Sequence, residues 1–309
     1  MRKEILLSFL MLFVFALSAF SENDFKFSGE FRIRSELDGR DFLNRTYPQS
    51  FTASRIRFNI EKTFFENVTI FLQLQDSRVF GQEKNTLTDL HNVDLHQGYV
   101  KIANLFDLPI FFQVGRFKIS YGVSKIFGPN DWHNVGRSHD GFRVGYEGKG
   151  FAIDGFLTTH TNFLNYRAGA ADIPNYDYIE APADTGFNIY GIYSKFKPSD
   201  IYSFDVYGYY EWNRLRPNRI DYQLQRYTLG VAYSLNLNPF FAYLEGAYQT
   251  GSIGNGRDIA SFMILASMGY SLKPFIVSLN ADITSGGKPT DSKYKLFDNP
   301  YSTKHNFQG

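Results

Sequence analysis

Residues 115–141, GRFKISYGVSKIFGPNDWHNVGRSHDG, bring together basic, imidazole, carboxylate and hydroxyl side chains that could do chemistry. Ser138, His139 and Asp140 have the side chain types of a hydrolytic triad, but adjacent residues point apart, and a triad is a spatial arrangement. Asp131 and the neighbouring histidines could ligate a metal ion, but such a site needs three or four converging ligands. We therefore interpret the stretch as a hydrogen-bonding outer loop, and we expect no enzymatic activity, no metal and no other cofactor.

Two glycine-rich stretches, GYEGKG (145–150) and GSIGNG (251–256), resemble phosphate-binding loops. A phosphate-binding loop opens a helix within a βαβ unit, and neither stretch precedes such a helix. Glycine reaches the positive φ angles that tight turns require. The two stretches therefore predict a hairpin turn and the exit of a strand into a loop.

The first 21 residues have the pattern of a secretory signal peptide. A charged start, MRKE, precedes 16 largely apolar residues, and Ala19-Phe20-Ser21 forms a small-x-small cleavage site. An uncleaved membrane anchor is the alternative, but a spanning helix would need about 20 apolar residues. We expect export, cleavage after about Ser21, and a mature domain that covers residues 22–309.

The charge and cysteine content exclude several classes of protein. The formal net charge is +1, and it falls to zero once the signal peptide is removed, which excludes a generally basic nucleic-acid binder. The chain has no Cys, so disulfides and thiolate metal sites are impossible. We expect no nucleic-acid partner.

Apolar and polar residues alternate with a period of two in the segments that must position the polar side chains. In the segment 24–37, apolar residues such as Phe27 and Phe31 alternate with polar ones such as Glu30 and Arg32. Such alternation predicts a strand with one apolar and one polar face. It also explains how a chain with 18% aromatic residues has a mean hydropathy of −0.28.

The alternation predicts about thirteen strands, joined by connections that are short and long in turn. The predicted strands lie near residues 25–37, 51–61, 67–78, 93–102, 110–121, 140–148, 150–160, 187–197, 201–212, 223–235, 240–251, 259–272 and 275–285. A soluble β-sandwich would have shorter strands, of about 5–6 residues, without this ordering of loops. The pattern is typical of an all-β, antiparallel transmembrane β-barrel of the outer membrane. Bacterial barrels have an even number of strands, so we expect a chain that is C-terminally truncated relative to a larger barrel. The alternative is a strand count that is wrong by one, but the sequence has no final apolar strand that ends in an aromatic residue.

Basic residues recur on the polar phase of the predicted strands and suggest a path for anions. The predicted basic residues of the lumen are Arg32, Arg34, Arg55, Arg57, Arg116, Lys118 and Arg143. A guanidinium group stays charged and pairs with a carboxylate in a two-bond fork. The alternative is structural, because barrel lumens are polar and these cations could simply pair with acids. The later inward phases do contain acids: Asp205, Glu211, Glu245 and Asp282.

The pattern GR-x4-YG-x5-GPxDWxNxGRSxDGxR within 115–143 resembles the alginate-export family of outer-membrane barrels. DLHQGYV (94–100) and FDNPYSTKHNFQG (297–309) are also similar to that family. The chain departs from it at Val123, Lys125 and His139, where the family favours an acidic residue, Arg and an aromatic residue. The resemblance implies a barrel with more strands and a basic pore that passes an anionic polysaccharide or another anion.

The loop 122–139 is predicted to fold into the mouth of the pore, because Pro129 and its glycines suit a packed segment. The predicted residues of this constriction are Lys125, Asp131, Trp132, Arg137 and Asp140. We expect an outer-membrane channel for passive diffusion of anions, with alginate as a candidate. The alternatives are a general or small-solute porin and a non-conducting structural barrel. Expected partners are outer-membrane lipid, anionic polysaccharide or small anions, and the barrel-assembly and periplasmic chaperone machinery.

Overall fold

The computed structural model describes residues 25–38, 49–83, 85, 92–162, 186–214, 223–254, 256–288 and 290–303. The predicted signal peptide lies outside these residues. The chain divides into two compact units, Met1–Lys101 and Ile102–Gly309, and each is described by itself. Within the described residues, no helix has both the length and the apolar character needed to cross a membrane.

The first unit contains three complete antiparallel strands. They are β1 (Phe25–Asp38), β2 (Gln49–Phe64) and β3 (Val68–Val79), and they are followed by most of β4 (Val93–Ile102). Phe27 and Phe31 on β1 are 61% and 68% exposed, whereas Arg55 and Arg57 on β2 are buried. Because successive side chains of a strand point to opposite faces, the predicted separation of apolar and polar faces is confirmed here.

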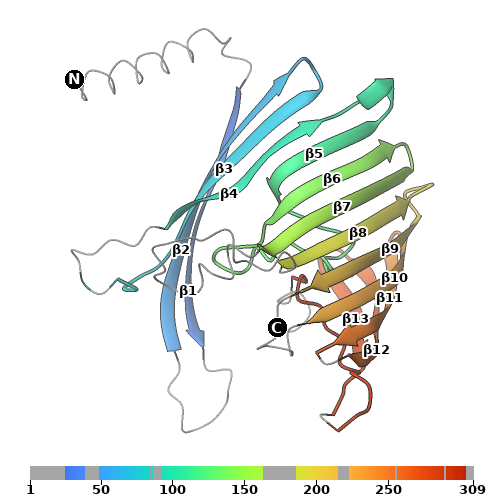
Figure 1. Cartoon of the computed structure of the whole chain (residues 1–309). Helices are drawn as coiled ribbons and strands as arrows, with labels where there is room; N and C mark the ends of the chain where they lie inside the picture. The colour runs from blue at the N-terminus through green and yellow to red at the C-terminus, as the bar shows by residue number, and fades with distance from the viewer. Residues whose placement is uncertain are drawn as a thin grey trace, which may run out of the picture. The chain divides into compact units, whose positions relative to one another are not determined.

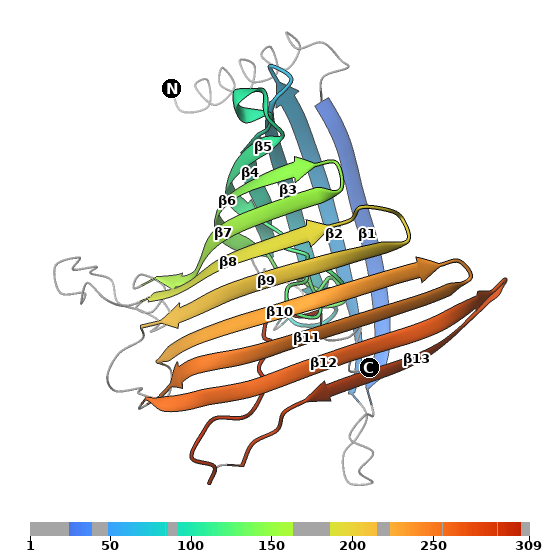
Figure 2. The same ribbon diagram turned by 90° about the vertical axis from the view of Figure 1, so that its right-hand side faces the viewer.

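The second unit is a series of antiparallel strands in chain order, as Figures 1 and 2 show. After the short 3-10 helix η1 (Leu105–Asp107) come β5 (Ile110–Phe117), β6 (His139–Gly148), β7 (Phe151–Asn162), β8 (Gly186–Phe196), β9 (Tyr202–Asn213), β10 (Leu224–Leu237), β11 (Phe240–Ile253), β12 (Arg257–Leu272) and β13 (Phe275–Thr284). The prediction of an all-β fold with about thirteen strands is therefore confirmed in the described residues.

Burial alternates along the strands of the second unit and defines two faces. On β9, Asp205, Tyr207 and Tyr209 are buried, whereas Phe204 and Val206 between them are exposed. The same period-two pattern recurs along β10 and β12. We call the face with the buried residues the inner face and the opposite one the outer face.

Two predictions about where strands end have different outcomes. The predicted strand 110–121 is wrong at its end, because β5 stops at Phe117 and the chain then leaves the sheet. Residues 149–150 form the turn between β6 and β7, where Gly150 has a φ of 75°. A Cβ at Gly150 would also lie 3.1 Å from the Lys197 carbonyl oxygen. The predicted hairpin turn at GYEGKG is therefore confirmed.

Candidate functional site

Two buried arginines form the centre of the polar face of the first unit. Arg55 donates to Glu30, with Nε 3.0 Å from Oε1, and Arg57 Nη1 lies 3.4 Å from Glu30 Oε2. Arg57 also donates to Gln75 Oε1 at 2.6 Å and lies 3.0 Å from His96 Nε2. Two guanidinium groups thus bind the same carboxylate.

The arginines of β1 lie on the same polar face. Arg32 is directly opposite Arg55 in the register of β1 and β2. Arg34 pairs with Glu36 at 2.6 Å. All four predicted arginines of the first unit therefore share one face of two neighbouring strands.

Arg143 lies on the inner face of the second unit and is paired there. It forms a salt bridge with Asp154 of β7, which also accepts a hydrogen bond of 2.5 Å from the hydroxyl of Tyr121. Burial and the charge of Asp154 raise the pKa of Tyr121 above its ordinary value, so the hydroxyl stays a donor. Arg143 thus helps to anchor the chain that follows β5.

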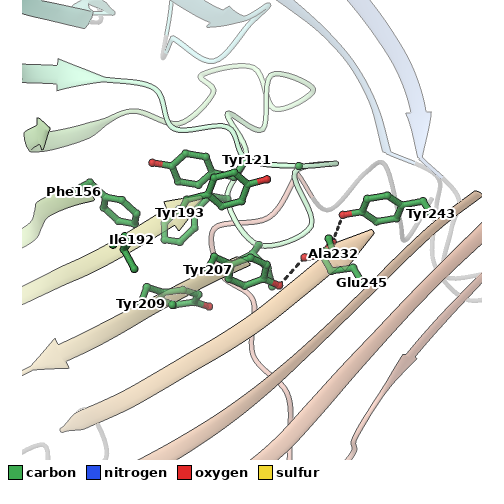
Figure 3. A pocket seen from close by; sticks show the side chains of 13 residues that line it. Tyr121, Phe156, Ile192, Tyr193, Tyr207, Tyr209, Ala232, Tyr243 and Glu245 are labelled. Atoms are coloured by element: carbon green, nitrogen blue, oxygen red, sulfur yellow. Dashed lines mark hydrogen bonds between the residues drawn. The ribbon is translucent and has the colours of Figure 1, made fainter. Parts of the chain in front are cut away.

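A second anchor is a group of tyrosines on β8, β9 and β11 around Glu245, which Figure 3 shows. Glu245 accepts hydrogen bonds from Tyr207 at 2.7 Å and from Tyr243 at 2.6 Å. Tyr193 stacks on Tyr121 with ring centroids 4.2 Å apart. The cavity that these residues enclose has a volume of about 20 Å³, which is room for about one water molecule and too small for a sugar.

Residues 118–138, which we call the inner loop, pack on the inner face. Phe127 contacts Phe156 of β7 and Tyr209 of β9, with ring centroids 5.2 and 5.1 Å apart. Lys125 is only 2% exposed and forms an ion pair with Asp282 of β13. The inner loop therefore reaches from β7 to the last strand of the unit.

A second segment, residues 297–303 or FDNPYST, lies against the inner loop, and we call it the strap. The amide of Gly128 donates to the Tyr301 carbonyl at 2.8 Å, and the amide of Thr303 donates to the Ser124 carbonyl at 3.0 Å. The ring of Tyr301 stacks on Phe127 with centroids 5.1 Å apart. The inner loop and the strap thus form one packed body.

Arg137 joins the inner loop to the strap through backbone carbonyls. Its guanidinium donates to the carbonyl of Gly128 at 2.9 Å and, on the strap, to those of Pro300 at 2.9 Å, Ser302 at 3.1 Å and Tyr301. Among the described residues, no carboxylate pairs with it. Removal from water lowers the pKa of Arg137 from its ordinary value.

The strap is fixed to the inner face by a buried ion pair on β9 and β10. Arg226 and Glu211 are 1% and 0% exposed in their side chains, and they form a two-bond pair with distances of 2.5 and 2.8 Å. Arg226 also donates to Asp298 at 3.1 Å, and the Tyr301 hydroxyl donates to Glu211 at 2.9 Å. Burial and the charge of Glu211 raise the pKa of Tyr301, which keeps this donor protonated.

Three predicted site residues lie elsewhere than expected. Arg116 was predicted to face the lumen, but it alternates with buried Gln113 and Phe117 and so lies on the outer face, 3.0 Å from Asp140. Asp140, which was predicted to lie in the constriction, pairs with Arg116 and so also lies on the outer face. Lys125 is buried in its pair with Asp282, so it offers no charge to a pore.

The other predicted residues of the loop have mixed positions. Lys118 pairs with Asp131 at 3.0 Å, so one predicted cation is offset by one predicted acid. Trp132 is 46% exposed. His139 and His160 lie 3.1 Å apart on the inner face. No group of three or more potential metal ligands occurs within the described residues.

Sequence reasoning missed the roles of Arg226 and the strap. The predicted inward phase of β10 contains Arg226, and that of β9 contains Glu211, so the period-two signal was present. The strap carries no periodic signal, because it is not a strand and many of its bonds are made by backbone groups.

The comparisons with known proteins give one family and several similar folds. A family model described as alginate export matches residues 24–307. No curated protein sequence matches the chain.

Two of the similar solved structures come from Pseudomonas aeruginosa. The structure of OccK11 (OpdR) is similar with a TM-score of 0.51 and 13% identity, over 85% of this chain and 63% of that one. The structure of OccK3 (OpdO) is similar with a TM-score of 0.51 and 11% identity, over 86% of this chain and 64% of that one. At such identities the likeness shows the fold alone, which is that of outer-membrane porin barrels. This chain spans less than two thirds of their length.

Proposed function

Because the chain belongs to the alginate export family, we propose that it forms an outer-membrane channel through which carboxylate-bearing anions diffuse passively. A polyuronate such as alginate is the proposed large substrate. The family and the porin-type fold support placement in the outer membrane. The basic face of β1 and β2 is the observation that carries the choice of anions.

The charge balance differs between the two units. The polar phases of β1 and β2 contain five basic residues and four acidic ones: Lys26, Arg32, Arg34, Arg55 and Arg57 against Glu30, Glu36, Asp38 and Glu61. On the inner face of the second unit, Arg143, Arg226 and Lys125 are each paired with an acid. The net positive charge that could attract an anion therefore resides on β1 and β2.

The proposed mechanism is exchange of carboxylates along the arginine row. A solute carboxylate can compete with Glu30 for the forked donors of Arg55 and Arg57, because both side chains bind that carboxylate. Several such sites in succession lower the barrier without holding the solute at any one of them. The residues bind and orient carboxylates, and no covalent step is involved.

A small-solute porin or a non-conducting barrel is the alternative that one observation favours. The inner loop and the strap fill part of the inner face of the second unit, and acids such as Asp205 and Glu245 line it. If these acids set the electrostatic potential inside the barrel, the channel will prefer cations. If the inner loop and the strap block the path, it will stay closed. Ion selectivity separates these alternatives from the anion channel.

We predict that the full-length protein in planar bilayers conducts chloride in preference to potassium, as the reversal potential across a KCl gradient would show. Added polyuronate should block the current. Replacing both Arg55 and Arg57 with Gln should shift the reversal potential towards cation preference and weaken the block several-fold. Arg116→Gln is the matched control, because Arg116 lies on the outer face and should leave both values unchanged.

Two results would contradict the proposal. If the wild-type protein prefers cations and polyuronate does not block it, the acids of β9 and β11 determine the electrostatic potential inside the channel. Equal selectivity of the wild type and the Arg55/Arg57 double variant would show that the arginine row takes no part in it.

A further inference from the structure

The outer face of the second unit has a hollow of about 630 Å³ that the proposed channel does not use. Two rows of outer-face residues cross β6 to β10 beneath and beside it. The floor row is Val144, Gly155, Ile192, Gly208 and Leu229, and the wall row is Phe142, Leu157, Tyr190, Tyr210 and Tyr227. The floor contains glycine on alternate strands, whereas every residue of the wall is bulky.

The two floor glycines are not required by the backbone. Neither Gly155 nor Gly208 has a positive φ. A Cβ at Gly155 would meet its nearest neighbour, the Val144 carbonyl oxygen, at an ordinary contact distance of 3.6 Å. At Gly208 the nearest atom, at 2.9 Å, is the end of the flexible Leu229 side chain. Side chains would fit at both positions, and the hollow exists because they are absent.

The hollow continues into a polar and then a cationic rim at one end of the sheet. Tyr210 stacks on Tyr227 with centroids 4.5 Å apart and lies 6.4 Å from the ring of Trp212. The guanidinium of Arg214 lies 4.2 Å from the centre of the Trp212 ring, and it donates to Asn188 at 2.5 Å. An apolar trough, a band of tyrosine hydroxyls and a cation thus follow one another along the face.

We propose that this hollow seats an acyl chain of an anionic membrane lipid, with the lipid phosphate directed towards Arg214. The proposal rests on the membrane placement in the proposed function, since the outer face then faces hydrocarbon. Apolar floor and walls suit the chain, and aromatic residues with a polar end suit the interface between hydrocarbon and headgroups. A positive charge beyond that interface attracts the phosphate of an anionic lipid.

The shape of the surface favours a lipid over a second copy of this chain. A stable protein interface usually buries more than about 1,000 Å² of well-matched surface. The trough is instead an open depression of about 630 Å³ beside the wall row and over the floor glycines, and a single flexible chain can lie in it. The cation at one end gives such a ligand a direction.

The test fills the trough with side chains at the two floor glycines, where the one close contact is with the flexible end of Leu229. Gly155→Leu combined with Gly208→Leu fills the floor, whereas Ala266→Leu adds apolar bulk on the outer phase of β12, outside the hollow. The full-length proteins are reconstituted with phosphatidylglycerol or phosphatidylcholine and transferred to detergent. Lipid retained per protein is then measured by native mass spectrometry, and circular dichroism checks that each variant keeps its strand content.

We expect the wild type and Ala266→Leu to retain phosphatidylglycerol, and the glycine double variant to retain several-fold less. Arg214→Gln should reduce the preference for phosphatidylglycerol over phosphatidylcholine while some lipid stays bound. Equal retention by the wild type and the filled variant would overturn the proposal. So would a dimer mass in the wild type that the filled variant loses, because the hollow would then be a subunit contact.

Flotation with vesicles separates failure of this site from failure of the proposed function. A wild-type protein that does not float with vesicles lacks the membrane placement on which both proposals rest. A protein that floats and retains lipid but does not conduct contradicts the channel and leaves the lipid site standing.

Discussion

Replacing Arg226 with Met should destabilise the protein by about 3–5 kcal/mol, because the change leaves a buried carboxylate without its partner. Arg226 and Glu211 are almost completely shielded from water and form a two-bond pair. The same substitution also removes the bond from Arg226 to Asp298 of the strap. The free energy of unfolding in urea, measured with the protein in lipid vesicles, gives the size of the loss.

A second variant tests whether the unpaired charge is the cause. Arg226→Met combined with Glu211→Gln removes both charges and keeps an acceptor for the Tyr301 hydroxyl, so it should recover most of the lost stability. Arg116→Met breaks a partly exposed pair on the outer face and should cost about 0–1 kcal/mol. If the single and double variants at Arg226 and Glu211 are equally unstable, lost packing rather than the buried charge explains the effect.

The strands could be predicted because one physical signal repeats along each of them. Phe27 and Phe31 face one side and Arg32 and Arg34 the other, since side chains alternate with a period of two. The same signal placed Arg55, Arg57 and Arg143 on polar faces. It also placed the later acids, such as Glu211 and Glu245, on the inner phases where the structure has them.

The loop residues could not be predicted, because no period links them to their partners. Lys125 pairs with Asp282, which lies on the last described strand, so its burial depends on a contact far along the chain. Arg137 binds backbone carbonyls of the strap, and a carbonyl has no signature in the amino-acid sequence. Arg116 is a different case, because it lies within β5 and its alternation with buried Gln113 and Phe117 places it on the outer face, so the period-two signal was present and the prediction did not follow it.

The largest functional effect is expected from Arg137→Met, which should raise the conductance of the channel several-fold. Arg137 is the residue that donates to three carbonyls of the strap and to one of the inner loop. Hydrogen bonds from a charged donor contribute about 1.5–3 kcal/mol each, so their loss should free the inner loop from the strap. We measure single-channel conductance of the full-length protein in planar bilayers.

Two further variants test whether Arg137 acts through its hydrogen bonds to the strap, a role that we call the latch, or through its positive charge. Arg137→Lys keeps the positive charge but cannot reach several carbonyls as a planar fork does, so it should raise conductance almost as much as Met. If the charge itself set the current, Arg137→Lys would instead behave as the wild type. Arg116→Met is the matched control on the outer face and should leave conductance unchanged.

Deletion of residues 124–136 gives the upper limit of the effect, because it removes the packed part of the inner loop altogether. Conductance that stays unchanged after this deletion would mean that the inner loop does not narrow the channel. A rise on deletion, but none in Arg137→Met, would mean that Phe127 and Tyr301 hold the loop through their stacked rings. If replacement of Arg137 and the deletion change the conductance in the same direction, the hydrogen bonds of Arg137 hold the inner loop against the strap. The strap then controls the width of the channel through its backbone carbonyls.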